Sequence, residues 1–110
     1  MKIGLCGREI ELIKIEGVSQ FSPGIYGKAD YDSLQIYICD NIPLRALYHE
    51  LAELFIYFTG QEQIENFDKE SVCNLSAALN EQLEIDNDID IFDRLKYFSE
   101  TGIDKEIEIT

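Results

Sequence analysis

Residues 44–58 read LRALYHELAELFIYF, and the rest of the chain must pack around this stretch. Its apolar side chains recur every three or four positions, which gathers them on one face of a helix at about 100° per residue. This face consists of Leu44, Leu47, Leu51, Leu54, Phe55 and Phe58. Pro43 suits a first helical turn, and Gly60 suits the position after a last turn. The pattern predicts a helix over about 42–59 that packs on a sheet, with His49 and Glu53 on the opposite face.

The residues before this helix have the alternating apolar pattern of strands. Residues 9–16 and 34–39 are rich in β-branched side chains that alternate with polar ones. Gly27, preceded by Ile25 and Tyr26, suggests a short strand that pairs with residues 34–38. We therefore expect a small, antiparallel-rich sheet of three or four strands over about 2–39.

The residues after the helix predict further helices. A second helix over about 67–84 has Val72, Leu75, Leu79 and Leu83 as its apolar stripe, and Glu70, Asn74 and Ala77 on its opposite face. Residues 86–88, Asp-Asn-Asp, interrupt this pattern, and residues 86–90 are expected to form a solvated acidic turn. A C-terminal helix and tail should occupy about 89–110. The expected fold class is α+β, a sheet followed by two or three helices in a single domain over 1–110.

Composition excludes several classes of protein. The chain has 110 residues, 45% of them hydrophobic, so it can bury enough apolar surface to fold. Its formal net charge of −13 opposes direct binding to nucleic-acid phosphates. No segment approaches the about 20 apolar residues of a membrane span. Three isolated cysteines, Cys6, Cys39 and Cys73, form neither a disulfide framework nor a paired metal motif, so we expect a cytoplasmic protein with no membrane partner.

One constellation in the main helix can carry chemistry. His49 and Glu53 are one turn apart, about 6 Å along the helix axis and about 40° around it, so their side chains can share one ion. The H-E-x-x-H motif uses this spacing to present two ligands, with the intervening glutamate as general base. Glu50 occupies that base position here, and Glu53 replaces the second histidine.

The chain resembles the small H-E-x-x-H metallopeptidases of the zincin type that bacterial and prophage genomes encode as minimal domains. The resemblance covers about residues 5–84: the segment 26–31 (YGKADY), the strand-like segment 34–38, the motif helix with its ending 58–60, and the second helix. It implies a minimal zincin-like fold and a peptide or protein as substrate or binding partner. It also implies an acidic third ligand on the second helix, for which Glu70 is the best match.

The motif is degenerate, because the chain contains one histidine and a site with two imidazoles is impossible. The remaining candidate set is His49, Glu53 and Glu70 as metal ligands, with Glu50 as catalytic base. Two carboxylates neutralise a divalent ion, which makes it a weaker Lewis acid and suits harder ions such as Mn²⁺ or Fe²⁺ better than Zn²⁺. We therefore expect a divergent homologue that is weakly active or inactive as a peptidase, with a pseudoenzyme favoured.

Two alternatives without catalysis stay open at this point. The protein can be an acidic binding or inhibitory protein that imitates DNA toward a basic partner. It can also be an interaction module of unknown oligomeric state, with Ile56 and Tyr57 as its contact surface. His49 and Glu53 are then a solvated i, i+4 pair of modest value, about 0.2–0.5 kcal/mol.

Overall fold

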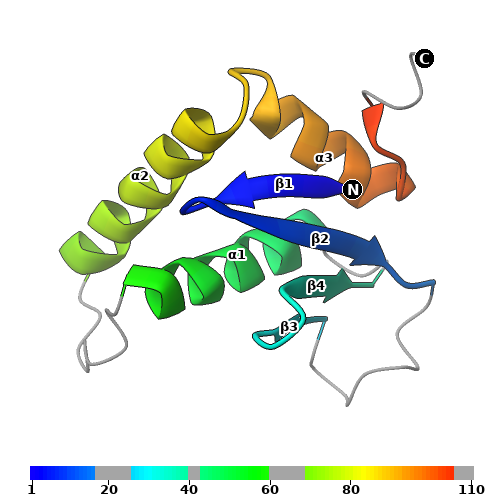
Figure 1. The fold of residues 1–110 in the computed structure, drawn as a ribbon, viewed down its shortest axis with the longest axis horizontal. Helices are drawn as coiled ribbons and strands as arrows, with labels where there is room; N and C mark the ends of the chain where they lie inside the picture. The colour runs from blue at the N-terminus through cyan, green and yellow to red at the C-terminus, as the bar shows by residue number, and fades with distance from the viewer. Residues whose placement is uncertain (17–25, 40–42, 60–68, 106–110) are drawn as a thin grey trace.

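The computed structural model describes residues 1–16, 26–39, 43–59 and 69–105, with side chains in all of these except 69–73. In chain order, the elements are β1 (Lys2–Leu5), β2 (Arg8–Lys14), β3 (Gly27–Asp30), β4 (Gln35–Ile38), α1 (Pro43–Thr59), α2 (Lys69–Asp86) and α3 (Ile91–Thr101). A four-stranded sheet is thus followed by three helices (Figure 1). This confirms the predicted α+β class.

The strands lie in the order β1-β2-β4-β3. The outer pairs β1–β2 and β3–β4 are antiparallel, and the central pair β2–β4 is parallel. The short strand expected at Gly27 pairs with β4 as predicted, with Ala29 opposite Ile36. Because a parallel pair needs a long connection, the chain between β2 and β4 travels away and back, and this places β3 at the edge of the sheet.

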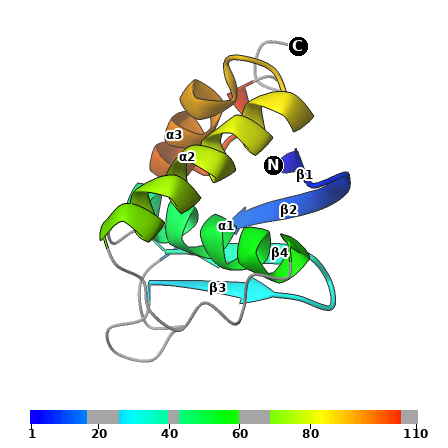
Figure 2. The ribbon, with the colours of Figure 1, turned by 90° about the vertical axis from the view of Figure 1, so that its left-hand side faces the viewer.

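Side chains along a strand alternate between the two faces of the sheet, so every second side chain points toward the helices. Helix α1 lies between the strands β3 and β4 and the helices α2 and α3 (Figure 2). It therefore buries more than its apolar stripe, and Ala46, which lies outside that stripe, is 7% exposed. The fully buried core consists of Leu5, Ile10, Leu12, Ile36, Ile38, Leu47, Leu51, Leu54, Leu83, Ile91, Leu95 and Phe98.

Two polar side chains at the end of α2, those of Asp86 and Asn87, cover the outer edge of β1. The Asn87 side chain accepts a hydrogen bond from the Gly4 N–H at 2.9 Å and donates one to the Gly4 carbonyl at 2.9 Å. Asp86 accepts a hydrogen bond from the Cys6 N–H at 2.6 Å. A Cβ at position 4 would lie 3.0 Å from the Asp86 carbonyl oxygen, so the contact requires glycine. The expectation of a solvated turn is wrong here, because Asp86 and Asn87 take the place of a neighbouring strand.

The helices lie close to their expected ranges. The second helix spans Lys69–Asp86, where about 67–84 was predicted, and the C-terminal helix spans Ile91–Thr101. It ends at Gly102, whose φ of 75° is the left-handed conformation that glycine adopts easily. The expected end of α1 at Gly60 and the last residues of the expected tail, 106–110, lie outside the described residues.

Candidate metal centre

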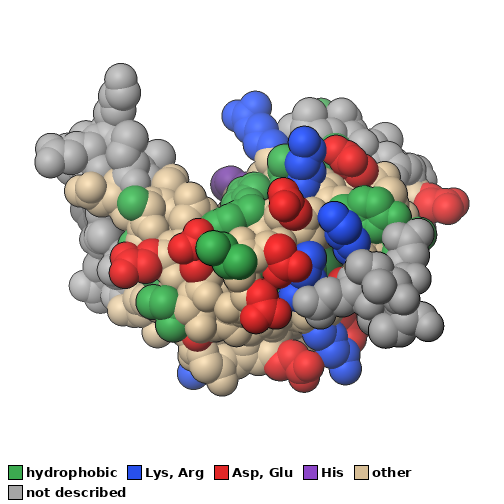
Figure 3. Space-filling model, turned by 90° about the horizontal axis from the view of Figure 1, so that it is seen from above, with side chains coloured by type: hydrophobic (Ala, Val, Ile, Leu, Met, Phe, Trp, Pro, Cys, Tyr) green, Lys and Arg blue, Asp and Glu red, His purple; other side chains and the backbone are tan. Residues whose placement is uncertain are grey.

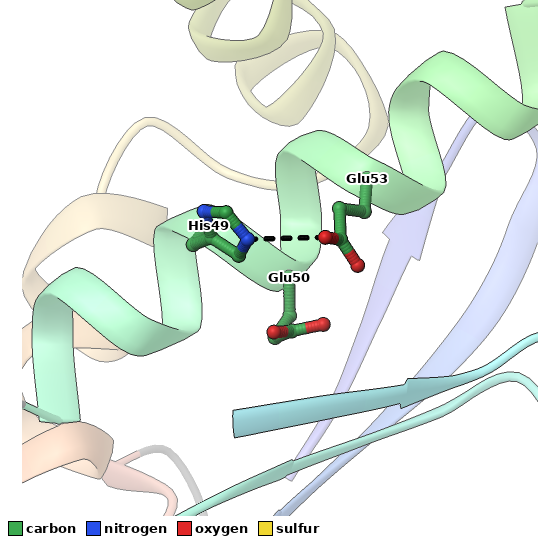
Figure 4. A group of neighbouring side chains, drawn as sticks. All are labelled: His49, Glu50 and Glu53. Carbon is green, nitrogen blue, oxygen red and sulfur yellow. Dashed lines mark hydrogen bonds and ion pairs between the residues drawn. The ribbon is translucent and has the colours of Figure 1, made fainter. Parts of the chain in front are cut away.

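Helix α1 presents His49 and Glu53 on its outer face, one turn apart. The His49 Nε2 atom lies 3.0 Å from Glu53 Oε1 (Figure 4). The two side chains are 67% and 43% exposed, respectively, so both can reach a ligand from solvent. The sequence-based expectation that these residues form a pair on one helix face agrees with this geometry.

Glu50 differs from its neighbours because it is buried, with only 6% of the residue exposed. It projects from α1 toward the edge of the sheet (Figure 4). The Ala29 backbone N–H of β3 donates a hydrogen bond to its carboxylate. A Cβ at Gly27 would lie 3.1 Å from Glu50 Cγ, so the glycine makes room for the carboxylate against the strand. Edge strand and helix together hold Glu50 in place.

Burial, together with the negative charge of Glu53 and a hydrogen bond with Glu53, raises the pKa of the Glu50 carboxyl to about 7. The hydrogen bond from the Ala29 N–H opposes this increase. A glutamate with such a pKa can bind or release a proton near neutral pH, which a general base must do.

The candidate ligand atoms of His49, Glu50 and Glu53 all lie within 4.8 Å of one another. Within the described residues, this is the group of histidine, cysteine and acidic side chains that can hold a metal ion. The structure therefore brings together three of the four residues proposed from the sequence. Glu70, the fourth, belongs to the first turn of α2, and its side chain lies outside the described residues.

A groove beside this group was not anticipated from the sequence. It has a volume of about 690 Å³ and runs between α1 and α2, with His49 in its wall. Leu79 and Phe92 line it as well, together with Tyr48, whose pKa is raised by burial. The groove depends on the angle between two helices, and no periodicity within either helix encodes that angle.

The cysteines and the helices add two further facts. Cys39 is buried and Cys6 is half-buried, while the side chain of Cys73 lies outside the described residues. Burial, followed by the nearby charge of Asp86, raises the pKa of the Cys6 thiol, which makes it less reactive.

In the described parts of the chain, no helix combines the length and the apolarity needed to cross a membrane.

The chain matches no protein-family model, and neither the curated proteins nor the solved structures include a significant match to it. The resemblance to zincin-type peptidases thus stays a prediction from the residues of this chain.

Proposed function

We propose that this chain is a divergent zincin-like domain that binds one divalent metal ion and is weakly active or inactive as a peptidase. The observation that carries the proposal is the grouping of His49, Glu50 and Glu53 within 4.8 Å on one helix. His49 and Glu53 would be ligands, Glu70 would be the third ligand, and Glu50 would be the base beside the ion.

The donor set suits a divalent transition metal. Zinc bonds to imidazole nitrogen and carboxylate oxygen are about 2.0–2.2 Å long, so two ligand atoms on one ion are at most about 4.4 Å apart. The His49 Nε2 and Glu53 Oε1 atoms, 3.0 Å apart, lie within that range. One nitrogen and two oxygens favour Mn²⁺ or Fe²⁺ more than a zinc site with several imidazoles does. A cation would also relieve the repulsion between the Glu50 and Glu53 carboxylates.

Each residue of the group has a distinct role in this proposal. A bound divalent ion would supply Lewis-acid chemistry toward water or a peptide carbonyl. Glu50, positioned by the Ala29 N–H, would hold and transfer a proton beside it. The second carboxylate, which replaces an imidazole at Glu53, lowers the net positive charge of the centre. Reduced acidity of bound water is the physical reason to expect weak turnover or none.

Calorimetric titration of Zn²⁺ and Mn²⁺ into the full chain tests the metal claim. We expect one saturable site in the wild type, a large loss of affinity in His49→Ala, and an unchanged site in Glu81→Gln. Glu81 is an exposed acid on α2 and serves as the matched control. The absence of a saturable site, or full affinity in His49→Ala, would overturn the proposal and leave His49 and Glu53 as a solvated pair.

A second measurement separates an enzyme from a pseudoenzyme. If the metal-loaded wild type hydrolyses a casein substrate and Glu50→Gln abolishes the hydrolysis, the domain is a peptidase. If both proteins give the same background rate while binding metal equally, the inactive form of the proposal holds.

The alternative of a DNA-mimicking inhibitor requires an unbroken acidic stripe. On the face shown in Figure 3, acidic side chains lie among Lys and Arg side chains. This mixed pattern favours the metal-binding proposal over a mimic.

A further inference from the structure

A line of aromatic contacts joins three separate parts of the fold. Tyr31, in the turn between β3 and β4, stacks on Tyr57 of α1 with ring centroids 4.8 Å apart and planes 25° from parallel. The ring centroids of Tyr57 and Phe58 are 5.8 Å apart, and the guanidinium of Arg8, the first residue of β2, lies 4.6 Å from the centre of the Phe58 ring. We call Arg8, Tyr31, Tyr57 and Phe58 the aromatic surface.

The two tyrosines hold each other in a stacked pair and remain partly exposed. Tyr31 is 42% exposed and Tyr57 is 45% exposed. Stacking holds the rings in a fixed arrangement, so a partner would immobilise them at little further entropic cost. Exposed, preorganised tyrosines are typical of residues that dominate binding energies at protein interfaces. The contact between Arg8 and Phe58 shows that a guanidinium is accommodated on the ring faces of this surface.

The acidic residues around the tyrosines determine the charge of a suitable partner. Asp32 follows Tyr31 directly and is exposed, and Glu53 precedes Tyr57 by one helical turn. Asp30 accepts hydrogen bonds from the N–H groups of Asp32 and Ser33, which lower its pKa and keep it charged. Together with the net charge of −13, these carboxylates favour a cationic partner.

We propose that the aromatic surface binds an arginine-bearing segment of a polypeptide, with a guanidinium over the tyrosine rings and the nearby carboxylates as counter-charges. His49, Glu53 and Tyr57 follow one another at intervals of four residues on α1, so a segment bound here passes beside the candidate metal centre. The inference rests on the rings and the charges, and it needs no bound metal.

The test measures peptide binding to the metal-free full chain in EDTA, by NMR titration with labelled tyrosine rings. The probe is a ten-residue glycine–serine peptide with four arginines, and the reference peptide has citrulline at the same four positions. We expect the ring signals of Tyr31 and Tyr57 to shift saturably with the arginine peptide, and the citrulline peptide to bind at least about 10-fold more weakly, because it lacks the positive charge.

Variants of the tyrosines complete the test. Tyr57→Ala should weaken binding about 2- to 30-fold, the range of one cation–π contact, while Tyr57→Phe should keep it. Ile89→Ala, which removes an 88% exposed apolar side chain elsewhere, should change nothing. Tyr31→Ala, in a turn outside the helix, repeats the test if Tyr57→Ala does not fold.

Three outcomes would overturn the inference: equal affinity for the citrulline peptide, full affinity in both alanine variants, or a lower oligomeric mass in Tyr57→Ala, which would make the rings a contact between two copies of the chain. Metal titration of Tyr57→Ala and Tyr31→Ala keeps this result separate from the proposed function. Both variants should bind metal as the wild type does, whichever way the peptide experiment turns out.

Discussion

Replacing Glu50 with glutamine should stabilise the metal-free protein at neutral and alkaline pH. The ordinary pKa of this carboxyl is 4.5, and in the folded chain it is about 7 because of burial and of the neighbouring Glu53 carboxylate. At 1.36 kcal/mol for each pKa unit, the ionised form costs up to about 3 kcal/mol above pH 7. Between pH 4.5 and about 7 the folded state holds a proton that the unfolded state has lost. The free energy of unfolding therefore falls as the pH rises through this window.

Glutamine has the shape of the protonated glutamate, so it can accept from the Ala29 N–H and donate to Glu53 without ionising. Glu50→Gln and the wild type should be equally stable below pH 4.5 and should differ by up to about 3 kcal/mol at pH 8. Urea unfolding followed by far-UV circular dichroism, in EDTA and at five pH values from 4 to 8, measures this difference. Glu81→Gln removes one exposed acid from α2 as the matched control and should follow the wild type closely.

Parallel pH profiles for Glu50→Gln and the wild type would refute the reasoning, because they would mean that Glu50 ionises in the folded chain at no cost. Glu53→Gln supplies an internal check. This substitution removes the Glu53 charge, the second cause of the raised Glu50 pKa, but leaves Glu50 buried. In the Glu53→Gln background, Glu50→Gln should therefore stabilise the protein at pH 8 by less than it does in the wild type, but still measurably. In saturating Mn²⁺ at pH 8 the wild type should be more stable than Glu50→Gln, because a cation stabilises the charged carboxylate of the wild type.

Three further substitutions address the fold. Asn87→Ala should lower the free energy of unfolding by about 1–3 kcal/mol, because the Gly4 N–H and carbonyl at the edge of β1 lose their hydrogen-bond partner. Equal urea midpoints for the variant and the wild type would contradict this. Gly27→Ala should destabilise by about 1–2 kcal/mol through a clash with Glu50, and part of this loss should return in the double variant with Glu50→Ala. Asp104→Ala leaves the Arg94 guanidinium buried without this carboxylate, now 3.3 Å away, and should cost about 3 kcal/mol in thermal unfolding at matched salt.

The elements that the sequence predicted well are those whose signal is local. The apolar stripe of Leu47, Leu51 and Leu54 is sufficient to define α1 and its buried face, and the same periodicity defines α2. Gly27, preceded by Ile25 and Tyr26, was sufficient to place a short strand beside β4. The pairing of His49 with Glu53 follows from helical geometry alone, which is why the centre of the candidate site was predictable.

The features that were missed depend on contacts between distant residues. Glu50 lies on the flank of the apolar stripe, and its burial follows from the arrival of the edge strand β3, not from helical periodicity. Strands β2 and β4 pair in parallel, so the chain between them has to return to the same end of the sheet before β4 begins. No periodic pattern in the sequence signals this parallel pairing. Tyr31 and Tyr57 are far apart in the sequence, so their stacking has no sequence signal either.

The hydrogen bonds that Asp86 and Asn87 make with the edge of β1 can form only late in the synthesis of the chain. Gly4 and Asn87 are separated by 83 positions. At translation rates of about 5–20 residues per second, Asn87 is synthesised about 4–17 s after Gly4, so the hairpin of β1 and β2 lacks its hydrogen bonds to the Asn87 amide for that time. A nascent chain therefore exposes an unsatisfied strand for seconds, the interval in which ribosome-associated chaperones act and in which neighbouring chains on a polysome can pair wrongly.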